Sequence, residues 1–499
     1  MPGSGSGAVP LKQPGGGEKG GMFPVHPLLF GCLFVLMGLK QLLPYATAGE
    51  FIWDLLVVSA CIAALELLFA CFFRERHKAG AATSLCVIFF CFFGDFKGLC
   101  EGWFLQSRWP LLASARWVFP PVTILFLALF FGLVRSKGGF RTPGKFLNAL
   151  SGVLVAFSVA QAAWVPPGIA TDDKPRDHTP LRVGANPPDI YYILTDAYTS
   201  QESLGKYWQY DNSPFVNYLT QQGFRVLANA RGNGTFTPRC LSISLGMDYP
   251  PEPGNLNLAA QTAYYGRLIE NAEAPARLKA SGYEVRALSL FPTAGQPRQY
   301  YFPKISPETL AALLWNKTPM GYFTAYLTRA TLGDTNLKIL DSLPAIAAER
   351  TGRPKFVYAH LMMPHAPYLF DREGHRIRRG MGMDDQSPAL YLGQLIYENK
   401  LLTNAVAGIL KNSQAPPIII VQGDHGYRSL AAPNQKEEAT TILNALYMPG
   451  SKADWVYPGM TPANTFRMIF NHYFDGGYPY VADVTPNTIS PFVSDSQGK

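Results

Sequence analysis

Long apolar runs dominate the first third of the chain. Five of them approach the roughly 20 residues that an α-helix needs to cross a bilayer. They cover 23–45, 51–73, 80–99, 115–135 and 146–165. The pattern predicts a membrane domain of about five helices over residues 23–165. The Gly-, Pro- and Ser-rich residues 1–22 before it are expected to form a disordered tail.

Basic residues flank these runs unequally, and the imbalance predicts an orientation. One side carries nine of them: Lys12, Lys19, Arg74, Arg76, Lys78, Arg135, Lys137, Arg141 and Lys145. The other side carries four: Lys40, Lys97, Arg108 and Arg116. Because positively charged loops stay in the cytoplasm, we expect the N-terminus there and, after an odd number of crossings, residues 166–499 outside.

Ala46, Thr47 and Ala48 resemble a signal-peptidase site, but the run before them is long for a signal peptide, which favours an uncleaved helix.

The pattern changes after the last apolar run. Six prolines over residues 166–188 predict a stiff linker. Beyond it, three short runs are apolar on both faces, which is typical of parallel strands covered by helices on both sides. They cover 189–196, 355–360 and 417–421. The clearest helical pattern between them begins with Ser387 as N-cap and Pro388 as its first residue. Residues 189–499 are therefore expected to form an α/β domain with a mainly parallel sheet.

Composition narrows the classes of function. Charged residues are only 16% of the 499, and the formal net charge is +8. A positive charge can indicate nucleic-acid binding, but these Lys and Arg flank apolar runs and form no basic patch interleaved with aromatic residues. We therefore expect an integral membrane protein with no nucleic-acid partner. Cys240 is alone in the globular part, so that part holds no internal disulfide.

Acidic and imidazole side chains follow the predicted strands. Asp196 ends the first, His365 lies shortly after the second, and Asp424 and His425 follow the third. Because the carboxyl ends of parallel strands meet at one edge of a sheet, we expect these groups to come together. Carboxylate oxygen and imidazole nitrogen suit zinc or manganese better than calcium. The pattern predicts a site for one divalent metal ion.

A hydroxyl nucleophile is the remaining requirement for catalysis. Thr237 precedes a short helical pattern over 241–245, where it is either the N-cap of that helix or a nucleophile activated by the metal. Thr235 is a competitor for the same role. His365 is expected to contact a substrate phosphate or to protonate a leaving group, whereas His360 within the strand is expected to be structural.

Four motifs carry a resemblance to a known family. IYYILTDAY, TPRCLSISLGM, HLMMPHAPY and IIIVQGDHGYR resemble, in their order and spacing, the alkaline phosphatase superfamily in its sulfatase-like branch. The resemblance implies that the metal is held by Asp196, Thr237, Asp424 and His425. It also implies that Thr237 is the nucleophile and His365 the substrate contact. Phe236 stands where sulfatases carry the Cys or Ser that becomes formylglycine, so sulfatase activity is not expected.

The membrane runs followed by an outward domain are similar to lipoteichoic acid synthases and phosphoethanolamine transferases. The resemblance implies a transferase in the bacterial cytoplasmic membrane, with its catalytic domain in the periplasm or extracellular space. Its donor would be a membrane lipid carrying a phosphorylated headgroup, and its acceptor a surface glycan or lipid. Two alternatives remain open: a hydrolase that uses water as acceptor, and a non-catalytic subunit of an envelope-assembly complex that keeps the fold.

Overall fold

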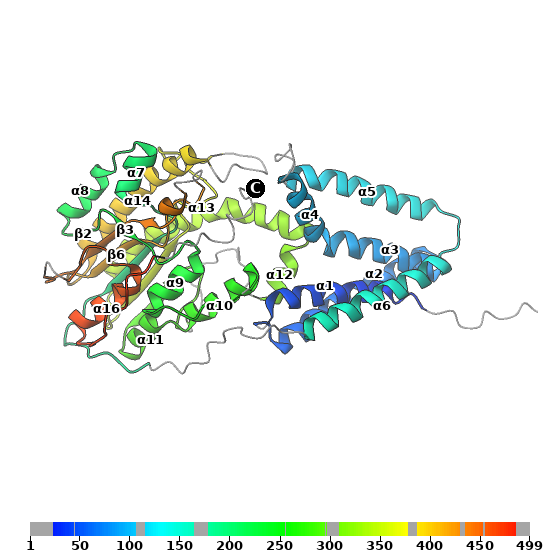
Figure 1. Cartoon of the computed structure of the whole chain (residues 1–499), viewed down its shortest axis with the longest axis horizontal. Helices are drawn as coiled ribbons and strands as arrows, with labels where there is room; N and C mark the ends of the chain where they lie inside the picture. The colour runs from blue at the N-terminus through cyan, green and yellow to red at the C-terminus, as the bar shows by residue number, and fades with distance from the viewer. Residues whose placement is uncertain are drawn as a thin grey trace, which may run out of the picture.

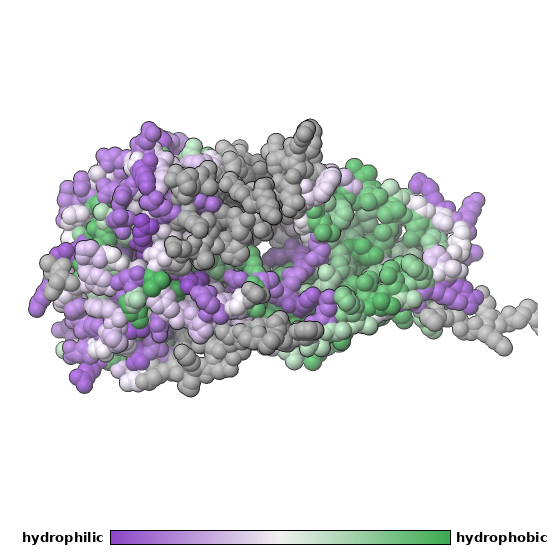
Figure 2. Space-filling model, in the orientation of Figure 1, coloured by the Kyte–Doolittle hydropathy of each residue, from purple (hydrophilic) through white to green (hydrophobic). Residues whose placement is uncertain are grey.

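The computed structural model describes residues 23–43, 45–105, 115–163, 178–254, 256–294, 296, 309–377, 387–429, 435–452 and 455–485. The expected tail over 1–22 and most of the expected linker lie outside the described residues. The chain forms two parts, a bundle of helices from its first third and an α/β domain from the remainder (Figure 1). An apolar band covers the bundle between polar surfaces at both of its ends (Figure 2).

The five apolar runs all contain helix. The helices of the bundle are α1 (His26–Leu42), α2 (Ala48–Phe72), α3 (Arg76–Cys91), α4 (Phe93–Leu105), α5 (Ala115–Arg135) and α6 (Arg141–Ala163). Among the described residues, three helices are long and apolar enough to cross a membrane: α2, residues 117–135 of α5, and α6. The pair α3 and α4 makes a fourth if it counts as one bent span, whereas α1, with 17 residues, is shorter.

The apolar run over 80–99 does not form one continuous helix. The chain bends by 54° between α3 and α4. At the bend the backbone N–H of Gly94 donates to the carbonyl oxygen of Lys317, at 2.7 Å, far along the chain. A Cβ atom on Gly94 would lie 2.8 Å from that oxygen, so only glycine allows the close approach. The bend is a tertiary contact that the local sequence does not encode.

The α/β domain is built on a six-stranded sheet. Its strands are β1 (Ile190–Thr195), β2 (Arg225–Val226), β4 (Glu284–Leu288), β5 (Lys355–Leu361), β6 (Ile418–Gly423) and β8 (Asn444–Tyr447), in the order β2-β8-β6-β1-β5-β4. The four strands β6-β1-β5-β4 are parallel, and β8 and β2 add an antiparallel edge. β3 (Ala230–Arg231) and β7 (Thr441–Ile442) form a separate pair. The predicted α/β class with a mainly parallel sheet is confirmed.

Helices cover both faces of this sheet (Figure 1). They are α7 (Gln201–Trp208), α8 (Ser213–Gln221), α9 (Thr237–Gly246), α10 (Leu258–Glu270), α11 (Glu273–Ala280), α12 (Leu310–Asn316), α13 (Pro319–Ala348), α14 (Pro388–Asn412), α15 (Gln435–Glu438) and α16 (Pro462–Tyr473). Helix α14 begins where the sequence predicts, because the Ser387 side chain accepts from the N–H of Leu390. Every residue of β1 is buried, as expected for a central strand.

The bundle and the α/β domain share an apolar cluster. It contains Phe34 and Leu42 of α1, Tyr264 of α10, and Leu310 and Leu314 of α12. Polar contacts reinforce it: Asn257 Nδ2 donates to the Gln41 carbonyl oxygen at 2.7 Å, and the Arg267 guanidinium donates to the Tyr45 carbonyl oxygen. These contacts place α10 and α12 against the end of α1, so the α/β domain rests on the bundle.

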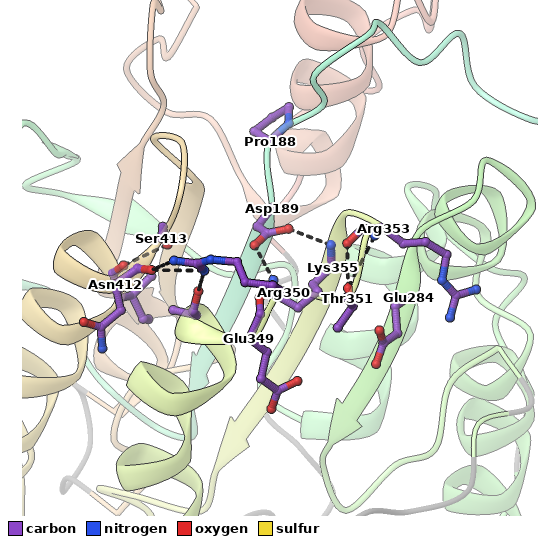
Figure 3. Close-up of polar contacts among 12 residues, drawn as sticks. Pro188, Asp189, Glu284, Glu349, Arg350, Thr351, Arg353, Lys355, Asn412 and Ser413 are labelled. Carbon is purple, nitrogen blue, oxygen red and sulfur yellow. Dashed lines mark hydrogen bonds and ion pairs between the residues drawn. The ribbon is translucent and has the colours of Figure 1, made fainter.

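An ion pair between buried Lys355 and half-buried Asp189 joins the starts of two central strands (Figure 3). Lys355, which begins β5, points its ammonium at Asp189, the residue before β1, with Nζ 2.9 Å from Oδ2. The Lys355 N–H also donates to Asp189 Oδ1 at 2.7 Å, and its Nζ to the Glu349 carbonyl oxygen. Lys355 is buried, and Asp189 is the counter-charge of its ammonium.

Asp189→Asn should therefore destabilise the full chain by about 1–3 kcal/mol, because it removes the counter-charge of a buried ammonium. The measurement is the thermal unfolding midpoint of the protein in detergent. The matched control is Glu437→Gln, which breaks the exposed Lys206–Glu437 pair and should leave the midpoint nearly unchanged. Equal shifts in the two variants would contradict the assignment.

Candidate active site

Adjacent strands bring the predicted site residues to one edge of the sheet. Asp196 follows β1, and Asp424 and His425 follow β6. Thr195 pairs with Gly423 in the β1–β6 register, so Asp196 and Asp424 are the next residues on both strands. On the other side of β1, the loop after β5 carries His365, whose N–H donates to the Asp196 carbonyl oxygen at 3.0 Å.

Two carboxylate oxygens lie close to a ring nitrogen of His425 at this edge. His425 Nε2 lies 3.5 Å from Asp196 Oδ1 and 3.5 Å from Asp424 Oδ2. The His425 Nδ1 proton donates to the Gly426 carbonyl oxygen at 2.7 Å, which leaves a lone pair on Nε2. Both carboxylate oxygens are buried, and neither has a hydrogen-bond partner among the residues that the structure describes. Ligands about 2.1 Å from a tetrahedral zinc ion lie about 3.4 Å from one another, which matches both of these distances. Among the described residues, the group at this edge whose donor atoms all lie within 4.8 Å of one another is Asp196, His365 and His425.

Thr237 supplies the fourth group. It is the first residue of α9, and its hydroxyl oxygen lies 3.2 Å from His425 Nε2 and 3.5 Å from Asp196 Oδ2. The N-cap of α9 is Phe236 and no side chain caps this helix, so the interpretation of Thr237 as a capping residue is wrong. Thr235, two residues earlier, is buried, and its carbonyl oxygen accepts from Arg428 at 3.0 Å.

Burial and neighbouring charges shift the pKa values of the two carboxyl groups in opposite directions. Burial raises the pKa of Asp424 to about 6, and the charge of Asp196 adds to the increase. Burial opposes ionisation of Asp196 as well, but the imidazoles of His365, His360 and His425 outweigh it and hold its pKa well below its usual range. Burial, with Arg428 nearby, lowers the pKa of His425 to about 3, so this imidazole is neutral at neutral pH.

Arg428 is a site residue that the sequence analysis missed. Its Nη2 lies 2.5 Å from His365 Nε2, and its Nη1 donates to the Thr235 carbonyl oxygen. His365 Nδ1 donates to the Ala366 carbonyl oxygen at 2.5 Å, so Nε2 is the acceptor for the guanidinium. Contacts between described residues thus use two of the five Arg donors, which leaves three for a ligand within that part of the chain. Arg428 is the last residue of the motif GDHGYR, but the sequence does not show which groups its guanidinium contacts.

His360 also lies closer to the site than expected. It is the sixth residue of β5 and fully buried, with Nε2 3.4 Å from Asp196 Oδ2 and Nδ1 3.4 Å from the Ser289 hydroxyl. A polar residue near the end of an otherwise apolar strand was the available signal. Cys240, in contrast, is buried, and burial raises the pKa of its thiol, which makes it a poor nucleophile.

A cavity of about 580 Å³ opens onto these groups. Its polar end is formed by Asp196, Thr237, His360, His365 and Arg428. Its remaining walls are mainly apolar and come from the start of α9, the loops after β4 and β5, α10 and its N-cap, α12, and the end of α1. The residues are Gln41, Phe236, Pro238, Asn257, Leu258, Ala259, Thr262, Leu290, Phe291, Leu313 and Met362. The volume lies in the range of ligand pockets, and one wall belongs to the bundle.

No family model matches the chain, and no curated protein matches it. Among solved structures, the C-terminal periplasmic domain of EcEptC from Escherichia coli is 13% identical, with a TM-score of 0.41, over 62% of this chain and 92% of that chain. The integral membrane protein lipooligosaccharide phosphoethanolamine transferase A (EptA) from Neisseria meningitidis is 12% identical, with a TM-score of 0.36, over 85% of this chain and 87% of that chain. A sulfatase-like chain from Bacteroides thetaiotaomicron is 13% identical, with a TM-score of 0.34, over 63% of this chain and 76% of that chain. With TM-scores below 0.5, these likenesses carry no argument about the activity or substrate of this chain.

The raised pKa of Asp424 gives a pH dependence of metal binding. Below about pH 6 the metal-free carboxyl takes up a proton, which a cation must displace. The apparent zinc dissociation constant of the purified chain should therefore rise about tenfold for each pH unit below that value. Titration calorimetry across this range measures it.

Two variants test whether Asp424 binds the metal ion. Asp424→Asn should lose the ion, because an amide supplies no anionic ligand. Asp371→Asn is the control: it alters the exposed group Asp371, Glu373 and His375, which also has metal-binding side chains close together, and should leave the stoichiometry unchanged. Full binding by Asp424→Asn would contradict a metal site at the strand ends.

Proposed function

We propose that the chain is a membrane-anchored phosphotransferase of the sulfatase-like branch of the alkaline phosphatase superfamily. It moves a phosphorylated headgroup, such as phosphoethanolamine or phosphoglycerol, from a membrane lipid to a cell-envelope glycan or lipid. The observation that carries the proposal is the Thr237 hydroxyl, which faces His425 and Asp196 at the polar end of a largely apolar cavity.

Asp196, Asp424, His425 and Thr237 would hold one divalent cation, zinc or manganese. The two unpartnered carboxylate oxygens and the lone pair of His425 Nε2 support this set. His365 also has a donor atom within 4.8 Å of those of Asp196 and His425. Its Nε2 faces the Arg428 guanidinium, however, and that positive charge disfavours a cation there. A bound cation would lower the pKa of the Thr237 hydroxyl and stabilise charge on phosphoryl oxygens.

The residues around Thr237 suit a phosphoryl group. The Thr237 oxygen forms a bond to phosphorus while the bond from phosphorus to the lipid oxygen breaks, and the hydroxyl proton passes to the departing lipid oxygen. An acceptor hydroxyl then bonds to the phosphorus, the bond to Thr237 breaks, and the acceptor proton returns to the Thr237 oxygen. The N-terminus of α9 favours the negative charge of the phosphoryl oxygens. The free donors of Arg428 bind the same oxygens, and His365 orients the guanidinium. Sequence reasoning assigned the phosphate contact to His365; we now assign it to Arg428, with His365 as its support.

The apolar walls of the cavity support a lipid-linked donor. Leu258, Leu290, Phe291 and Leu313 line it within reach of Thr237. A free, water-soluble phosphate ester would gain nothing from these side chains, whereas the glycerol and acyl parts of a lipid would bury apolar surface against them. Gln41 and Asn257 provide hydrogen-bonding groups on the same cavity for the polar part of a substrate.

The proposal includes the domain boundaries of the chain and its orientation in the membrane. The membrane domain covers residues 23–165 with five spans, including α1 and the bent α3–α4 pair, and a linker over 166–188 leads to a catalytic domain over 189–499. The nine basic residues on one side of the runs support a cytoplasmic N-terminus in the bacterial inner membrane. The catalytic domain then lies on the periplasmic or extracellular side.

Thr237→Ala should reduce headgroup transfer by at least about 10³-fold, because it removes the nucleophile. Thr237→Ser should retain part of the activity, and Thr235→Ala, the matched control, most of it. Mass spectrometry of protein trapped with a phospholipid donor should find the headgroup phosphate on Thr237. An adduct on Thr235 would move the nucleophile by two residues. Full activity of Thr237→Ala would reject the mechanism, and release of headgroup phosphate without a transfer product would indicate a hydrolase.

A reporter fusion tests the orientation. A phosphatase that is active only in the periplasm, fused after residue 180, should be strongly active, because five crossings from a cytoplasmic N-terminus end outside. A fusion after residue 75, between α2 and α3, is the control and should be inactive. The reverse pattern would place the candidate active site in the cytoplasm and contradict the proposed donor and acceptor.

A further inference from the structure

We propose that α12 and the start of α13 form a second membrane contact of the α/β domain, one that lies in the interface of the bilayer rather than across it. The contact surface consists of Trp315, Met320 and Phe323, which we call the corner patch. Its partner is the headgroup and upper acyl region of the leaflet on the side of the α/β domain.

The exposure of these side chains is unusual for the domain. Among its described residues, five large apolar side chains are strongly exposed: Trp315, Met320, Phe323, Tyr480 and Val484. Their exposed fractions in the corner patch are 45%, 43% and 56%. Three of the five therefore gather in one short stretch of chain. A cluster of exposed apolar side chains marks an interaction surface, whereas single ones do not.

The three side chains lie together at the α12–α13 corner. Met320 and Phe323 are three residues apart in α13, and Thr324 is four residues after Met320, so helical geometry puts them on one face. The Trp315 indole N–H donates to the Thr324 hydroxyl at 2.9 Å, which brings the Trp ring to that same face. A satisfied indole N–H with an exposed ring suits the bilayer interface, where Trp is enriched.

The corner patch continues the apolar surface of the bundle. Lys317, between α12 and α13, forms a 2.7 Å ion pair with Asp95 of α4 and accepts from the Gly94 N–H. Tyr322 packs edge-on against Phe93, with ring centroids 5.5 Å apart. Helix α4 itself exposes Phe96 and Leu99. Because the neighbouring apolar surface belongs to helices suited to a bilayer, the occupant that fits the patch is lipid and not a soluble protein.

The patch and the cavity lie on the same short helix. Leu310, Leu313 and Leu314 of α12 are buried, and Leu313 lines the cavity that opens onto Thr237. If the proposed function holds, a helix set in the interface would place the mouth of that cavity at the depth of lipid headgroups. A donor lipid would then reach Thr237 without leaving the bilayer.

Photo-cross-linking tests the contact. The full chain, with p-benzoyl-phenylalanine at Phe323, is placed in nanodiscs of phosphatidylethanolamine and phosphatidylglycerol and irradiated. We expect lipid adducts by intact-protein mass spectrometry. The same amino acid at Tyr480, which is also 45% exposed but outside the corner patch, is the control and should give none. A second probe at Met320 should reproduce the adducts if the first variant folds poorly.

Three results would overturn the proposal: no lipid adducts at either corner position, equal adducts at Tyr480, or a cross-linked dimer of the chain in place of lipid adducts. The last result would assign the patch to a second copy. Irradiation of the Thr237→Ala protein separates this proposal from the proposed function, because cross-linking to lipid requires no catalysis. Adducts in that inactive background would support the contact whatever the substrate is.

Discussion

The parallel pairing of β1 with β6 on one side and β5 on the other is the constraint on which the candidate site depends. In the observed register Thr195 is level with both Gly423 and Leu361. The chain therefore leaves β1 and β6 at the same height, with Asp196 and Asp424 as the first residues beyond the sheet. A slip of one residue would send one of these side chains to the opposite face. The buried apolar residues of β1 resist such a slip, because each would lose its place in the core.

At the same edge of the sheet, the fold holds the Asp424 carboxylate and the His425 lone pair close together, although their contact is unfavourable. Asp424 Oδ1 accepts from the N–H groups of Ala197 and His425, which holds the carboxylate in place and leaves Oδ2 directed at His425. Ala197 adopts a left-handed conformation, with φ of 65°, in the turn that presents its N–H. Lone pairs that face one another without a proton are costly in a buried site. The fold maintains this arrangement because the core fixes the strands that carry it.

Much of this could be predicted from the sequence, because the relevant signals are local. Continuous apolar strands and the Ser387 cap give the α/β class, and polar residues directly after those strands identify Asp196, Asp424 and His425 as neighbours. The sequence could not separate Thr237 from Thr235, since both lie near the start of the same helix and only the fold shows which hydroxyl faces His425. Arg428 and the bend at α4 were missed for a related reason. Each depends on a contact with chain far away in sequence, with Thr235 and His365 in one case and Lys317 in the other.

Through Phe236, the helix bundle helps to shape the candidate active site. This residue precedes Thr237, and its ring packs edge-on against Tyr265 within the apolar cluster that also contains Phe34 and Leu42 of α1. Each such side chain contributes about 1.5–3 kcal/mol when buried. A fragment cut free of α1 would expose this cluster to water and remove one wall that supports the start of α9. Helix α1 therefore does more than anchor the chain, because it packs against the residues that orient the Thr237 hydroxyl.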